Sequence, residues 1–147
     1  RDNTTGSSNV AVGYNALLQN TTASNNTAVG YQSLYSNTTG NGNTFIGTDS
    51  GYNNSIGALN TFLGHQSGYG NATGVSNTFI GSCAGWSFTG SCGIALGVCA
   101  QPQADGEFAL GSSFAPVKMQ VGNSGSASCH LIIRINGTCY AIELMNP

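Results

Sequence analysis

The chain has 147 residues, 5% of them charged, and its formal net charge is −2 at pH 7. Lys and Arg together number three, so there is no basic patch, and binding through the nucleic-acid backbone is excluded. No apolar run approaches the roughly 20 residues that span a bilayer, so membrane insertion is not predicted.

A polar segment, residues 1–8, precedes a repeat that begins at residue 9. The repeat is a pentapeptide that reads, in chain order, NVAVG, NTAVG, NTFIG, NTFLG, NTFIG, GIALG and EFALG. Its final glycines are Gly13, Gly30, Gly47, Gly64, Gly81, Gly97 and Gly111, spaced by 17 residues and then by 16 and 14. Fixed periods of this size indicate stacked repeats. We predict an all-β fold, a parallel β-solenoid over residues 9–121 with about seven coils, each with two short strands joined by tight corners.

Equivalent positions of successive coils form columns in a solenoid. Four residues before the glycine is a column that predicts a ladder of amide hydrogen bonds: Asn9, Asn26, Asn43, Asn60 and Asn77. We assign the column directly before the glycine to the interior: Val12, Val29, Ile46, Leu63, Ile80, Leu96 and Leu110. The column two residues before the glycine must then face outward, because side chains alternate along a strand. An exposed apolar column marks an interface, so we expect self-association through Ala11, Ala28, Phe45, Phe62, Phe79, Ala95 and Ala109.

The pentapeptides NTAVG and NTFIG are followed by Ser or Ala three residues after the glycine, at Ser33, Ser50, Ser67 and Ala84. This pattern resembles the head repeats of YadA-like trimeric autotransporter adhesins. It is also similar to repeat-bearing tail-fibre and surface proteins of phages and large algal viruses. The resemblance covers residues 9–114 and implies a left-handed parallel β-roll, a homotrimer in which three chains pack around an axis through the apolar strand. The coils of this chain are longer than those of the bacterial adhesins.

The C-terminal segment, residues 122–147, lies outside the period. Its stretch HLIIRINGTCYAIEL, residues 130–144, has two β-rich runs around Asn136-Gly137, which predicts a β-hairpin. We expect this hairpin to cap the solenoid or to dock against partner chains.

All five cysteines are disulfide candidates: Cys83, Cys92, Cys99, Cys129 and Cys139. Cys83 and Cys99 each follow a repeat glycine by two residues, so we expect them to be stacked neighbours at a separation that a disulfide permits. The alternative is small buried thiols. An odd number leaves one cysteine free or available between chains. No Cys/His cluster is present, so neither a metal nor a cofactor is predicted.

Two kinds of surface feature recur along the chain. If the source is eukaryotic or a virus of eukaryotes, we expect glycans on the sequon asparagines Asn3, Asn20, Asn37, Asn53, Asn71 and Asn136; a further sequon, Asn25, abuts the strand. Asn-Thr pairs that simply form good corners are the alternative. Five residues after the glycine lies a mostly aromatic column that stacks either on sugars or on a neighbouring chain: Leu18, Tyr35, Tyr52, Tyr69 and Trp86.

Enzymatic activity is not predicted, because the titratable residues do not converge: Asp2, Asp49, Asp105, Glu107 and Glu143 are scattered, and His65 and His130 stand alone. The leading hypothesis is a non-enzymatic extracellular or virion-surface module, secreted with a processed N-terminus, that forms a rigid trimer displaying a surface to a host glycan or receptor. The first alternative is a filament subunit that stacks end to end. The second alternative is ice binding by Thr27, Thr44, Thr61 and Thr78. One observation argues against it: these threonines share the strand face of the aliphatic column that we assign to the interior.

Overall fold

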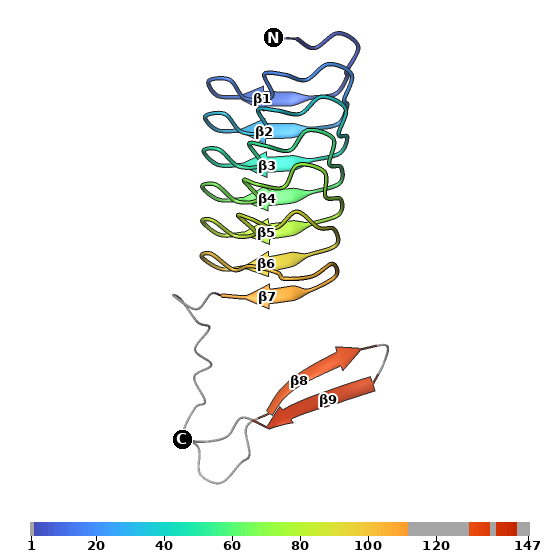
Figure 1. The fold of residues 1–147 in the computed structure, drawn as a ribbon, viewed down its shortest axis with the longest axis vertical. Coiled ribbons are helices and arrows are strands. Elements are labelled where there is room, and N and C mark those ends of the chain that lie inside the picture. Colours follow the sequence, from blue (N-terminus) through green and yellow to red (C-terminus); the bar gives the residue numbers. More distant parts are fainter. Residues whose placement is uncertain (1, 112–129, 136–137, 144–147) are drawn as a thin grey trace. The chain divides into compact units, whose positions relative to one another are not determined.

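The computed structural model describes residues 2–111, 130–135 and 138–143. The chain divides into two compact units, Arg1–Val117 and Lys118–Pro147. The first unit is a parallel β-solenoid (Figure 1), which confirms the fold predicted from the repeat. Its strands are β1 (Val10–Val12), β2 (Thr27–Val29), β3 (Thr44–Ile46), β4 (Thr61–Leu63), β5 (Thr78–Ile80), β6 (Ile94–Leu96) and β7 (Phe108–Leu110).

The strands stack in chain order, each parallel to the next, and about six turns of chain connect the seven strands. The register pairs equivalent repeat positions, as in Thr44 with Thr61 and Phe45 with Phe62. The columns expected from the alignment are therefore columns in space. Residues 2–8 add a partial coil beside the first full one, since the Thr4 N–H donates to the Thr21 carbonyl at 2.8 Å.

The side of the coil opposite the strand is built from turns. The prediction of a second strand in each coil is therefore wrong. Residues two and four positions after the glycine adopt left-handed backbone angles, as at Gln32 (φ 50°) and Leu34 (φ 52°). The Gln32 N–H donates to the Tyr14 carbonyl of the preceding coil at 2.9 Å, and the Leu34 N–H donates to the Ser50 carbonyl of the following coil at 2.9 Å. The turns thus join successive coils by hydrogen bonds without forming an extended strand.

The repeat glycine allows the coils to approach each other closely. Gly47 and Gly64 have φ values of 136° and 137°, in a region that residues other than glycine rarely adopt. A Cβ atom on Gly64 would lie 2.5 Å from the Gly81 carbonyl oxygen. The glycine column is therefore required by both the backbone angle and the contact between coils.

The interior contains the column that we expected to lie outside. Phe45, Phe62 and Phe79 are fully buried, and their rings stack with centroids 4.4 Å and 4.7 Å apart. The aliphatic column directly before the glycine faces outward: Ile46 is 39% exposed and Val12 57%. The predicted orientation of the strand is wrong.

The reason is a match of side-chain volume across the coil. Where the strand carries Phe, glycine lies six residues later, and a Cβ atom on Gly51 would overlap the Phe45 ring. Where the strand carries Ala, as at Ala28, the same later position is a buried leucine, Leu34. The coils of β1 to β5 therefore each fill one interior space, either with Phe and Gly or with Ala and Leu, whereas the coil of β6 has Ala95 and Gln101 at these positions.

Two columns of buried asparagines flank this core. In the predicted ladder, the Asn60 N–H donates to Asn43 Oδ1 at 3.0 Å, and Asn60 Nδ2 donates to the Gly74 carbonyl at 2.8 Å. The amides bond from coil to coil as expected, although their partners are backbone groups. A second ladder, not foreseen, lies seven residues after the glycine and includes Asn37, whose Nδ2 donates to Asn20 Oδ1 at 3.0 Å.

The second unit contains β8 (His130–Ile135) and β9 (Thr138–Glu143), which pair antiparallel from Ile135 with Thr138 to His130 with Glu143. The turn residues Asn136 and Gly137 lie outside the described part of the chain, so the hairpin turn stays a prediction.

Candidate functional site

The outer surface of the strands forms one uncharged, largely apolar face, which we call the strand face. It consists of the outward side chains of β1 to β7: Val10, Val12, Thr27, Val29, Thr44, Ile46, Thr61, Leu63, Thr78, Ile80, Ile94, Leu96, Phe108 and Leu110. None of these residues is charged. Leu63 is 44% exposed, Ile80 40% and Phe108 55%. An exposed patch of this kind is typical of an interaction site.

The strand face carries a column of threonines at its centre. Thr27, Thr44, Thr61 and Thr78 lie opposite one another on β2 to β5, with Thr61 exposed and the other three half-buried. The expectation that this column is buried with the aliphatic one is wrong, because both columns face outward. The hydroxyl and methyl groups recur at the strand spacing of about 4.8 Å.

The predicted trimer interface is not on the surface, and this prediction is wrong. Five of its members are fully buried: Ala28, Phe45, Phe62, Phe79 and Ala95. The remaining two, Ala11 and Ala109, are half-buried at the two ends of the column. Any association along the strands must therefore use the strand face.

A second exposed surface lies on the turns and is called the turn face; its residues occupy the columns one, two and five positions after the glycine. The aromatic side chains of the fifth position stack in parallel, with centroids 5.0 Å apart for Tyr35 and Tyr52, 5.4 Å for Tyr52 and Tyr69, and 6.0 Å for Tyr69 and Trp86. Burial raises the pKa of Tyr52, as do the neighbouring Tyr35 and Tyr69. The tyrosine rings cover one another, and the described stack ends at Trp86.

The cysteines of the turn face are neighbours, as expected from their spacing. The Cys99 N–H donates to the Ser82 carbonyl at 2.8 Å, and the Cys83 and Cys99 side chains line the same hollow. Partial burial, and secondly Cys83, raises the pKa of Cys99. Both are free thiols, as is the exposed Cys92. The prediction of a disulfide between Cys83 and Cys99 is therefore wrong. Cys129 and the side chain of Cys139 lie outside the described residues, so a disulfide that involves them stays a prediction.

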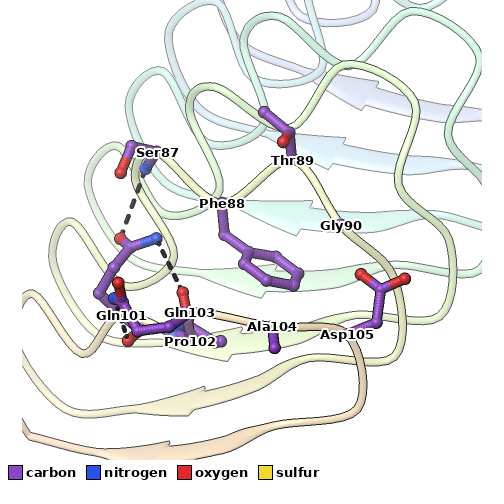
Figure 2. Close-up of a pocket in the computed structure, with 9 residues that line it drawn as sticks. All are labelled: Ser87, Phe88, Thr89, Gly90, Gln101, Pro102, Gln103, Ala104 and Asp105. Carbon is purple, nitrogen blue, oxygen red and sulfur yellow. Dashed lines mark hydrogen bonds between the residues drawn. The ribbon is translucent and has the colours of Figure 1, made fainter.

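Two hollows form where the period shortens after Gly81. The first, of about 310 Å³, lies between Ser87–Gly90 and Gln101–Asp105 (Figure 2). The Asp105 carboxylate accepts the Ser91 N–H at 2.9 Å. The second hollow, of about 360 Å³, is lined by Gln66, Cys83, Trp86, Cys99 and Gln101.

The carboxylates near these hollows accept hydrogen bonds from backbone N–H groups. Glu107 Oε2 accepts the N–H groups of Gln103 and Ala104, at 2.6 Å and 3.0 Å. His65 is exposed on the turn face. Within residues 2–111, no cluster of three His, Cys, Asp or Glu side chains forms a possible metal site. The side chains of His130 and Glu143 are outside the described part of the chain.

Of the asparagines predicted to carry glycans, those in the described part of the chain fall into a buried group and an exposed group. Asn20, Asn37 and Asn71 are at most 1% exposed and belong to the second ladder. The prediction of glycans at these three asparagines is wrong for the folded chain, because the side-chain nitrogen Nδ2 that would carry the glycan is buried. Asn3 and Asn53 are exposed and stay predicted sites, while Asn136 lies outside the described residues.

No helix in the described part of the chain is long and apolar enough to span a membrane. Comparisons with protein-family models, with curated proteins and with solved structures gave no significant match to this chain.

Proposed function

We propose that this chain is a non-enzymatic structural module of an extracellular or virion surface, and that it assembles as a homotrimer through the strand face. In this arrangement the three turn faces point outward and serve attachment to a host glycan or receptor. The observation that supports the proposal is the exposure of uncharged, branched side chains on every strand of the solenoid except β2, such as Val12, Leu63 and Leu110 at 57%, 44% and 50%.

The strand face suits a second and third copy of the same chain. Complete burial of an aliphatic side chain contributes about 1.5–3 kcal/mol, so covering a half-exposed one contributes about 1 kcal/mol. The outward aliphatic residues recur on every strand, so the contribution is repeated along the length of the solenoid. The face contains no charge whose desolvation would oppose association. Identical faces with a common repeat spacing can also align strand by strand around one axis.

The mass in solution tests this proposal. We expect a particle of three times 14.9 kDa in analytical ultracentrifugation at micromolar concentration. Leu63→Lys, which places a charge in the centre of the strand face, should give monomers. Thr73→Lys, an exposed position outside the strand face, is the matched control and should leave the trimer intact.

A monomeric wild-type chain, or a trimer that survives Leu63→Lys unchanged, contradicts assembly through this face. Open-ended polymers would instead support the filament alternative, in which the free edges of β1 and β7 join.

Ice binding is a second candidate, favoured by the outward threonine column. Hydroxyl and methyl groups that repeat regularly on an uncharged sheet face suit contact with an ordered water lattice. This function needs the strand face free, so it competes with trimer formation. It predicts a monomer that shapes ice crystals and loses this activity in Thr61→Lys. A trimer, or ordinary disc-shaped crystals in the presence of the wild-type protein, would exclude it.

A further inference from the structure

The hollow beside Trp86 differs from every other part of the repeat. The coils keep a spacing of 17 residues up to Gly81 and then shorten to 16 and 14. In the shortened coil, the position that continues the aromatic column is the buried Pro102. Trp86 packs one face on Tyr69, at 6.0 Å and 13° between ring planes, and is still 48% exposed. The break in the period thus leaves a large aromatic side chain partly open at the end of its stack.

Two amide side chains border the same hollow. Gln66 lies in the coil before Trp86, and Gln101 lies in the coil after it. Gln101 occupies a repeat position that is a buried Leu or Gly in earlier coils, as at Leu34 and Gly68, but its side chain is half-exposed and its Oε1 accepts the Ser87 N–H at 3.4 Å. Each glutamine amide both donates and accepts hydrogen bonds. An indole face beside two amides matches a ring with one apolar face and a rim of hydroxyl groups.

We propose that this hollow binds a neutral pyranose sugar, which stacks on Trp86 and hydrogen-bonds Gln66 and Gln101. The inference rests on the proposed attachment function and names its ligand class. None of the five lining residues is charged, so the hollow has no cation to pair with an acidic sugar. Its volume of about 360 Å³ lies within the usual range for small-ligand sites, about 300–1,000 Å³.

The neighbouring hollow also has two glutamines, Gln101 and Gln103 (Figure 2), but it lacks an exposed aromatic ring. Phe88, its aromatic residue, is 6% exposed, and the Asp105 carboxylate accepts the Ser91 N–H at 2.9 Å. The carboxylate would favour a cationic rather than a neutral ligand. The Trp86 hollow is therefore the better sugar site.

Trp86 is the single tryptophan of the chain, so intrinsic fluorescence reports directly on this hollow. Full-length protein is titrated with the methyl glycosides of glucose, galactose, mannose and N-acetylglucosamine, with their neutral oligosaccharides, and with sialyllactose as an acidic comparison. We expect a saturable fluorescence change with at least one neutral sugar and a weaker one, or none, with sialyllactose.

Isothermal calorimetry with the sugar that binds best then tests the residues. Trp86→Ala should weaken binding by about tenfold or more, and Gln101→Ala by a smaller factor. Tyr14→Ala, which removes a 70% exposed aromatic side chain outside the hollow, should bind like the wild type. Circular dichroism checks that each variant is folded.

Two results would overturn this assignment: no saturable response to any neutral sugar, or wild-type affinity in folded Trp86→Ala. Ultracentrifugation of the same samples separates this failure from that of the proposed function. A trimer without sugar binding refutes the sugar site alone, whereas a monomer refutes the trimeric module whatever the sugar does.

Discussion

Phe45 and Gly51 share one interior space, so a double substitution that exchanges their volumes should be less destabilising than either single substitution would suggest. Phe45→Ala removes a fully buried ring that stacks at 4.4 Å on Phe62, and such truncations cost about 3–5 kcal/mol of unfolding free energy. Gly51→Leu drives a side chain into the Phe45 ring, which costs about 1–3 kcal/mol. The left-handed backbone at Gly51, φ 59°, adds about 1–2 kcal/mol.

Together the two changes reproduce the preceding coil, in which Ala28 faces Leu34, and Leu34 already has φ 52°. The double variant should therefore lose only the cost of the left-handed leucine, about 1–2 kcal/mol. The expected coupling energy between the two sites is about 3 kcal/mol or more, at the upper end of measured values.

Urea denaturation followed by far-ultraviolet circular dichroism, at one fixed protein concentration, measures these free energies. Thr48→Ala, an exposed position in the same coil, is the control and should change stability by less than about 0.5 kcal/mol. If the double variant is no more stable than Phe45→Ala alone, the volume exchange does not explain the orientation of the strand.

Three further outcomes follow from the coil. Asn60→Ala should lower the free energy of unfolding by about 2–4 kcal/mol in urea denaturation, because it leaves a buried N–H and a buried carbonyl of the coil-to-coil ladder without partners; an unchanged midpoint would contradict the role of the ladder. Gly64→Ala should cost about 2 kcal/mol or more, since its Cβ would lie 2.5 Å from the Gly81 carbonyl oxygen at a φ of 137°, and a thermal melt equal to that of the wild type would refute the close contact. The raised pKa of Cys99 predicts that its alkylation by iodoacetamide, read by mass spectrometry, increases through a pH above the usual titration of a free thiol, because only the thiolate reacts; Cys83→Ser should bring this midpoint closer to the usual value.

The solenoid itself was predictable, because its period, its glycine column and its asparagine column are all visible in the letters. The inward face was not recognised, since both faces of each strand are apolar. A usable signal existed: the position six residues after each inward residue is Leu in the coils that carry Ala28 and Ala11, and Gly in those that carry Phe45, Phe62 and Phe79. Such compensation in size marks residues that share one interior.

Other features depend on details that residue type does not reveal. Asn53 and Asn71 belong to similar sequons, yet they lie six and seven residues after their glycines, and only the first is exposed. Left-handed backbone at Gln32 and Cys83 has no local sequence signature, because it is imposed by hydrogen bonds to the adjacent coils. The hollow beside Trp86 arises from the three-dimensional effect of a shortened coil.

The pair of Phe with Gly and the pair of Ala with Leu fill the same interior space, which makes the 17-residue coils interchangeable building units. Each of these coils pairs with its neighbours through the same repeat positions. A gain or loss of 17 residues would therefore lengthen or shorten the solenoid by one coil and keep the pairing of the remaining coils. Tandem duplication would thus change the length of the solenoid without redesigning the core.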